Sequence, residues 1–415
     1  MTAIKVAPVP LAKRPEFVIL VISRMFAALA GIAFATTIGL QVYRLTHNPL
    51  SLGLMGLIEA IPALSLALLG GYIADHYDRR KLTLITSVIE VICLALLLVV
   101  ALNPERMGIS AIYVSIFIYG MAAGFNRPAF SAFEQQVIPN DQVARATSML
   151  SSVSQAGAIV GGPIAGFVID RFGIPTAYAF ILGLLTLAVV CVVLIKPRPM
   201  PVPIKGETIW QSLRAGVRFV ARSQPLVGSM ALDLFAVLFG GAMALLPVFA
   251  DDILHVGAIG LGWLRTAPSL GALVVMLWAT RRPPTHNAGR NLLIVVAAFG
   301  VSFIVFALSQ NFWLSMLALF FSGVFDGVSM IIRGVIVRVM SPEAMRGRIA
   351  AVSWMFIGAS NEVGAFESGL AASLLGTAPS VFWGAVVTLL VVGLVAATMP
   401  RLRSLKLSGE EAAPE

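Results

Sequence analysis

Nine ionisable residues lie inside long apolar stretches of this 415-residue sequence, and they are the residues best suited to carry chemistry. A charge at the centre of a bilayer costs about 2.5–3.5 kcal/mol, so such residues indicate a polar interior lined by paired or protonatable groups. A buried carboxyl can keep its proton through desolvation or lose it beside an arginine, which is what proton coupling requires. The nine residues are Arg24, Glu59, Glu90, Asp233, Arg265, Asp326, Arg333, Glu362 and Glu367.

The most regular pattern among the polar residues is a stripe near position 326. Ser322, Asp326, Ser329 and Arg333 are spaced i, i+4, i+7 and i+11, which places them on one face of a helix. Asp326 is therefore the first candidate for a group that binds a proton or a substrate. The alternative is that Asp326 pairs with Arg333 or another basic group and only holds helices together.

Glu362 and Glu367 lie five residues apart in another apolar stretch. This spacing separates them by about 140° around a helix, so we do not expect them to share one proton. We expect either one to face a polar interior while the other braces Arg333, Arg338 or Arg346.

The elements that must position these residues are membrane helices. Hydrophobic residues make up 58% of the chain and charged residues 12%, against about 45–50% and about 25% in a soluble domain. A water-soluble globule is thereby excluded. Windows of about 20 apolar residues predict twelve transmembrane helices. They lie near 17–41, 51–74, 82–102, 109–131, 144–169, 174–195, 225–248, 257–280, 291–308, 312–334, 349–373 and 379–399.

The distribution of basic residues predicts the orientation. With both termini in the cytoplasm, the inside segments carry 21 lysines and arginines and the outside segments only Arg44, Arg106 and Arg171. The net charge of +9 then reflects topology, so nucleic acid is not an expected partner. A cytoplasmic (inner) membrane protein is predicted.

Other kinds of chemistry find little support in the sequence. Cys93 and Cys191 lie in apolar stretches and are expected to pack rather than to bind metal. The four histidines are isolated in loops, and no phosphate-binding Gly-x-x-x-x-Gly-Lys loop or nucleophile elbow occurs. We expect no enzyme activity, no metal and no cofactor.

The two parts of the chain share an offset of 203 residues. Six glycine, proline or arginine positions coincide at this shift: Gly120 with Gly323, Gly124 with Gly327, Pro139 with Pro342, Arg145 with Arg348, Gly161 with Gly364, and Gly166 with Gly369. The shift also brings Glu59 to Gly262, three residues from Arg265, which suits a cavity or gate between two repeats. The sequence predicts two pseudo-symmetric six-helix bundles. The expected divisions are 1–195, a cytoplasmic linker at 196–224 with an amphipathic helix bearing Arg214, Arg218 and Arg222, then 225–400 and a tail at 401–415.

The loop after the second span resembles the loop signature of the major facilitator superfamily. The matching residues are Gly71, Asp75, Arg79, Arg80 and Lys81, with a departure at Asp78, where the superfamily has glycine. Asp75 at a helix end can hold the basic residues in one state, as an inside latch that breaks on switching. In the second repeat Trp278 replaces Asp75, so we expect a weaker latch there.

The fifth span is similar to the Gly/Pro motif of exporters in this superfamily. Gly161, Gly162, Pro163 and Gly166 carry the match. The alternative is close helix packing through small residues, which requires no export. Ser23-Arg24, the linker helix from Trp210 to Pro225 and the loop from Ser341 to Arg348 further resemble the branch with enterobactin exporters and macrolide efflux proteins.

This resemblance implies the major facilitator fold, with spans 1, 4, 7 and 10 around a central cavity. Asp326, Asp233 and Arg24 then belong to cavity helices, with fixed ion pairs as the alternative role. Glu90 would lie on a lipid-facing span and be structural. Arg127 ends the fourth span, where the superfamily's mid-span arginine is absent, which puts the usual proton relay in doubt.

The implied function is secondary active export. We expect a monomer in the lipid bilayer that exchanges protons for an amphipathic small molecule, a drug or a siderophore, by alternating access. Transport of another solute such as a lysolipid or a sugar is the alternative, and a non-transporting receptor, a channel or an intramembrane enzyme is less favoured.

Overall fold

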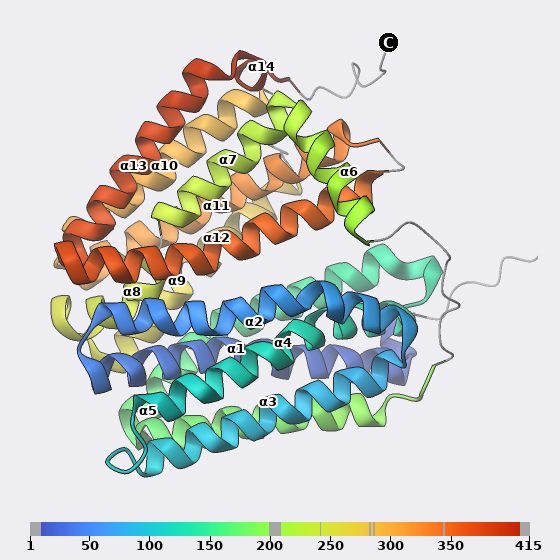
Figure 1. Cartoon of the computed structure of the whole chain (residues 1–415), viewed down its shortest axis with the longest axis vertical. Coiled ribbons are helices and arrows are strands. Elements are labelled where there is room, and N and C mark those ends of the chain that lie inside the picture. The colour runs from blue at the N-terminus through green and yellow to red at the C-terminus, as the bar shows by residue number, and fades with distance from the viewer. Residues whose placement is uncertain are drawn as a thin grey trace, which may run out of the picture. The chain divides into compact units, whose positions relative to one another are not determined.

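The computed structural model describes residues 10–198, 209–240, 242–281, 284, 287–342 and 345–406. Within these ranges the chain is helical and contains no β-strand (Figure 1). The expected all-α fold is confirmed. Much of the linker, His286, Arg282 and the end of the tail lie outside the described residues.

The chain divides into two compact units. Unit 1 consists of Met1–Thr37 and Ile61–Ile204, and unit 2 of Ile38–Ala60 and Lys205–Glu415. The boundary therefore runs through α1 (Pro15–Thr46) and α2 (Pro49–His76), whose adjoining ends group with unit 2. The start of α2 groups with unit 2 because it packs closely on α12. The two helices approach at glycines, since a Cβ built on Gly369 of α12 would lie 2.9 Å from the Cα of Gly53. The two six-helix bundles with a division at 196–224 remain a prediction.

Unit 1 contains the long helices that follow α2. They are α3 (Arg79–Leu102), α4 (Ile109–Val137) and α5 (Val143–Leu194), with short 3-10 helices at Leu11–Lys13 and Asn140–Gln142. α5 is two helices joined at Gly173, whose φ of +83° interrupts the helix just before Pro175. The break falls between the predicted spans 144–169 and 174–195. Only glycine adopts such a backbone angle at little cost.

Unit 2 contains the remaining helices. They are α6 (Ile209–Arg222), α7 (Gln224–Phe239), α8 (Ala242–Val248), the π-helix η3 (Phe249–Ile253), α9 (Gly257–Ala279), α10 (Ala288–Leu308), α11 (Phe312–Met340), α12 (Arg346–Leu375), α13 (Thr377–Thr398) and α14 (Pro400–Arg403). The predicted span 225–248 is interrupted at Gly240, between α7 and α8. α6 packs against α7 and α12, with Val220 in the core and Arg214, Arg218 and Arg222 exposed.

Ten stretches of the described residues are long and apolar enough to cross a membrane. One of them is α5, which holds two helices, and α12 is not among the ten. Large apolar side chains such as Leu308, Trp313 and Leu374 are exposed on the helix surfaces, as expected for contact with lipid. The chain is a multi-pass membrane protein, and the count of twelve spans remains a prediction.

Candidate functional site

Three of the predicted residues meet in one ion-pair cluster inside unit 2. Arg333 on α11 pairs with Asp233 on α7, and its Nη2 lies 3.6 Å from Oδ1 of Asp326 on α11. The Arg333 and Asp233 side chains are 12% and 9% exposed, whereas that of Asp326 is 48% exposed. We call Asp233, Asp326 and Arg333 the α7–α11 cluster. It holds two carboxyls against one guanidinium, with Asp326 the more loosely held acid.

The gap inside the α7–α11 cluster is small, although the Asp326 side chain itself is half exposed. The gap beside it measures about 10 Å³, at the lower limit for one ordered water. Asp233, Phe299, Phe325 and Asp326 line this gap. Arg333 Nε is buried without a hydrogen-bond partner, so the guanidinium depends on its two carboxyls.

Arg24 belongs to a different group of residues, in unit 1. Its Nη1 lies 3.4 Å from Oε1 of Glu134 on α4, and its Nε donates a 2.9 Å hydrogen bond to Oγ of Ser154 on α5. Its guanidinium also lies 5.8 Å from the centre of the Phe130 ring. Glu134 is not among the sequence candidates, because the predicted span ends at 131 whereas α4 continues to Val137. We call Arg24 and Glu134 the α1–α4 pair.

A cavity of about 330 Å³ opens beside the α1–α4 pair. It lies among α1, α3, α4 and the second part of α5, and its lining includes Glu90 and Arg127. Glu90 is buried and accepts a 2.9 Å hydrogen bond from Asn126 Nδ2. The span that carries Glu90 is expected to face lipid. The Glu90 side chain is nevertheless directed to α4, where Asn126 donates a hydrogen bond to it.

The other predicted ionisable residues lie elsewhere in unit 2. Glu362 on α12 faces α2, where its Oε2 is 3.6 Å from a Cβ built on Gly56. Glu367 accepts a 3.4 Å hydrogen bond from Ser368 Oγ. Glu59 on α2 and Arg265 on α9 are both partly buried.

The predicted latch residues fasten the α2–α3 junction to its neighbours in unit 1. Arg79 Nη2 lies 3.2 Å from Asp75 Oδ1, and Arg79 Nη1 donates to the carbonyl of Ala132 on α4 at 3.3 Å. Arg80 donates to the carbonyl of Val193 on α5 at 2.6 Å. Asp78, where the superfamily has glycine, caps α3 by accepting a 3.1 Å hydrogen bond from the Lys81 backbone N–H.

Two glycines in this region differ in their role. A Cβ on Gly70 would lie 2.6 Å from the carbonyl oxygen of Gly124, so Gly70 allows α2 and α4 to touch. Gly71, the residue singled out in the sequence, has no atom within 4 Å of such a Cβ. Close packing therefore explains Gly70, and the structure gives no packing reason for Gly71.

The Gly/Pro motif of α5 lies against α1. A Cβ on Gly161 would be 3.0 Å from Ile32 Cβ and 3.1 Å from the Leu29 carbonyl oxygen. Gly162 and Gly166 are buried, and Pro163 lies within the helix. Small residues thus let α5 approach α1 closely, as the packing interpretation expects.

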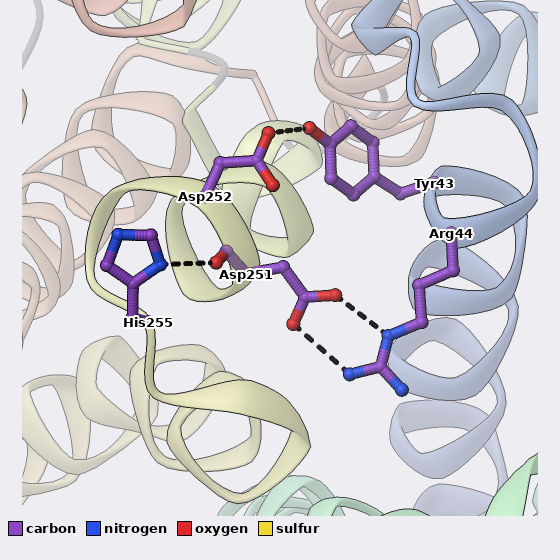
Figure 2. Close-up of polar contacts among 5 residues, drawn as sticks. All are labelled: Tyr43, Arg44, Asp251, Asp252 and His255. Carbon is purple, nitrogen blue, oxygen red and sulfur yellow. Dashed lines mark hydrogen bonds and ion pairs between the residues drawn. The ribbon is translucent and has the colours of Figure 1, made fainter.

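A further cluster joins the end of α1 to the π-helix η3 within unit 2 (Figure 2). Arg44 donates two hydrogen bonds to the Asp251 carboxylate, at 2.8 and 3.2 Å, and Tyr43 donates one to the Asp252 carboxylate. His255 Nδ1 lies 2.9 Å from the Asp251 carbonyl oxygen. We call Tyr43, Arg44, Asp251 and Asp252 the α1–η3 cluster. Sequence reasoning misses it, although Arg44 is one of the three arginines expected outside.

Curated relatives of this chain are exporters. The chain is 27% identical over 340 residues to the enterobactin exporter EntS of Shigella boydii serotype 18, and the match covers 81% of this chain and 79% of the relative. The EntS protein of Escherichia coli O81 gives the same values.

Solved structures of transporters share the fold. A mutant of the nucleoside transporter NupG has a TM-score of 0.74 at 16% identity, over 92% of this chain and 99% of that one. A POT family transporter in complex with 5-aminolevulinic acid has a TM-score of 0.72 at 13% identity, over 93% and 96%. The major facilitator fold expected from the sequence is therefore confirmed.

The family assignment covers nearly the whole chain. Residues 6–414 match the family described as transmembrane secretion effectors. The chain belongs to this transmembrane secretion effector family, and it is an efflux transporter of the major facilitator superfamily.

Proposed function

We propose that this transporter exchanges protons for an amphipathic small molecule, a drug or a siderophore, which it moves out of the cytoplasm by alternating access. The α7–α11 cluster carries this proposal. Two carboxyls and one guanidinium leave one negative charge when both acids are ionised, and one proton neutralises the cluster. Because Arg333 on α11 contacts a carboxyl on α7 and another on its own helix, a bound proton changes how strongly α7 and α11 hold together.

Within the cluster, Asp326 is the proton carrier and Asp233 the fixed partner of Arg333. Asp233 is buried and in close contact with Arg333, so its proton exchange would leave a buried cation poorly paired. Asp326 is half exposed and 3.6 Å from the guanidinium, so it can meet water and lose its proton at smaller cost.

The relatives of this chain support the proposed direction of transport and the choice of the first test compound. Membership of a secretion family and likeness to enterobactin exporters support outward transport, with a catecholate siderophore as the first probe. The excess of arginine and lysine on one side supports an inner-membrane monomer with both termini in the cytoplasm.

Alternating access also requires contacts that open in turn at the two membrane faces. In the predicted orientation, Asp75 and Arg79 lie at the cytoplasmic face and the α1–η3 cluster at the outer face. We assign the α1–η3 cluster to the outer closure, because its hydrogen bonds must break before the end of α1 can leave η3.

The experiment uses everted membrane vesicles with an acidic interior. The wild-type chain should accumulate enterobactin or ethidium inside the vesicles, and an uncoupler should abolish the accumulation. Asp326→Asn should reduce gradient-driven accumulation at least tenfold at equal expression, because an amide cannot carry the proton. The exposed Asp141→Asn makes the same chemical change outside the cluster and should transport normally.

Two results would contradict the proposal. Accumulation by the wild type that persists with the uncoupler would remove proton coupling. Full coupled transport by Asp326→Asn would remove Asp326 as the carrier.

A further inference from the structure

The cavity beside the α1–α4 pair is much larger than the gap beside the α7–α11 cluster. Its volume of about 330 Å³ is many times the roughly 10–15 Å³ that one ordered water needs. Empty cavities in proteins are apolar, whereas this one has charged, hydroxyl and amide side chains on part of its wall, beside apolar residues such as Phe130 and Leu185. Its polar lining includes Arg24, Ser87, Glu90, Arg127, Ser131 and Glu134. This composition is suited to a hydrated chamber.

Glu134 is the least firmly held acid at this cavity. Its Oε1 is buried and has no hydrogen-bond partner, and its 3.4 Å distance to Arg24 Nη1 exceeds the 2.7–2.9 Å of a charge-assisted hydrogen bond. Arg24 meanwhile donates to Ser154, which holds the guanidinium without help from Glu134. Glu134 can therefore gain a proton without leaving Arg24 devoid of partners.

The other charged groups that face Glu134 come from three helices. Arg24 is on α1, Glu90 on α3 and Arg127 on α4, while α5 contributes the neutral Ser154. Glu90 accepts a 2.9 Å hydrogen bond from Asn126, whereas Oε1 of Glu134 accepts none. Of the two acids, Glu134 is thus the one placed to change its protonation.

We propose that Glu134 is a second proton-binding carboxyl and that the cavity is the water-filled chamber that supplies it. A hydronium ion in the chamber gives its proton to a carboxylate oxygen of Glu134 and leaves as water. The neutral acid no longer attracts Arg24, whose charge is then available to an anionic group entering the chamber. This inference rests on the proton coupling proposed above and adds a site that the α7–α11 cluster does not contain.

The main test compares two transport assays in liposomes, with enterobactin and ethidium as probes. Glu134→Gln should lose gradient-driven accumulation at least tenfold but keep counterflow exchange, which moves no net protons, within twofold of wild type. Glu134→Asp should retain gradient-driven accumulation, because it keeps a titratable group. The exposed Glu105→Gln is the matched control and should behave as wild type.

The outcomes separate this inference from the proposed function. A proton-coupled wild type together with a fully coupled Glu134→Gln would overturn the inference alone. Loss of counterflow in folded Glu134→Gln would also overturn it, since it would indicate a structural role. Wild-type accumulation that does not depend on the pH gradient would overturn both proposals.

A labelling experiment tests the chamber even if Glu134→Gln fails to fold. Ser131 lines the cavity and is exposed, so Ser131→Cys can be made in a chain whose Cys93 and Cys191 are replaced by alanine. A membrane-impermeant thiol reagent should label this cysteine in intact membranes, at least tenfold faster than one at Cys93, which is buried. Absence of labelling from both membrane faces would exclude a hydrated chamber.

Discussion

Each of the two units pairs an arginine with at least one carboxyl, but the surroundings of the two arginines differ. In unit 2, Arg333 is 12% exposed beside a gap of about 10 Å³. In unit 1, Arg24 is 38% exposed beside a cavity of about 330 Å³. A charge without water depends on its ion-pair partners, whereas a charge beside water does not. The comparison predicts that Arg333 depends on its carboxyl partners more strongly than Arg24 does.

The largest effect is expected when the α7–α11 cluster loses its cation. Arg333→Leu leaves Asp233 buried against an apolar side chain, and removal of one partner from a buried pair costs about 3–5 kcal/mol. We expect poor folding or a strongly lowered midpoint of thermal unfolding in detergent. The double variant Arg333→Leu with Asp233→Asn should recover much of the loss. If the double variant does not recover thermal stability, then the packing around Arg333, rather than its charge, stabilises unit 2.

A smaller effect is expected from crowding the contact that positions Ser154 beside Arg24. A Cβ on Gly157 would lie 2.7 Å from Ala28 Cβ, so Gly157→Leu must push α5 from α1 at a cost of about 1–3 kcal/mol. Gly71→Leu is the control, because a Cβ there meets no atom within 4 Å. Thermal unfolding of both variants measures the difference. Equal unfolding midpoints would show that the contact between α1 and α5 accommodates a leucine side chain at little cost.

The smallest effect on stability is expected when the α1–α4 pair loses its cation. Arg24→Leu removes a partly exposed charge and leaves Glu134 at the edge of the cavity of about 330 Å³, where water can solvate its carboxyl, so the cost should be about 1 kcal/mol or less. The same unfolding measurement applies, and the ratio of the Arg333→Leu effect to the Arg24→Leu effect expresses the comparison as one number. Similar losses of stability in the two variants would show that the larger cavity beside Arg24 makes no difference to the cost of removing the arginine.

The sequence is most informative where a pattern stays within one helix. The spacing of Asp326 and Arg333 places them on one face of α11, and the gap between the fifth and sixth spans matches the break at Gly173. Helical periodicity reports the face of a residue's own helix and says nothing about the helix opposite. The contact between Asp233 and Arg333, a hundred positions apart, could not follow from it.

Two omissions have the same physical origin. Glu134 lies in the last turns of α4, beyond the apolar window that defines the span, so the hydropathy pattern does not include it in a helix. The α1–η3 cluster depends on a π-helix that brings Asp251 and Asp252 to the end of α1, and hydropathy carries no signal for such a helix. Polar residues near helix ends are therefore where sequence reasoning fails in this chain.

Helix α1 carries Arg24 in unit 1 and Arg44 in unit 2 without an interruption. Twenty residues at 1.5 Å each separate these arginines by about 30 Å. An unbroken helix is stiff along its axis. A shift or rotation of the helix that displaces one arginine is therefore expected to displace the other. We therefore expect a displacement of α1 at Arg24 to reach the contact between Arg44 and Asp251 through the helix itself.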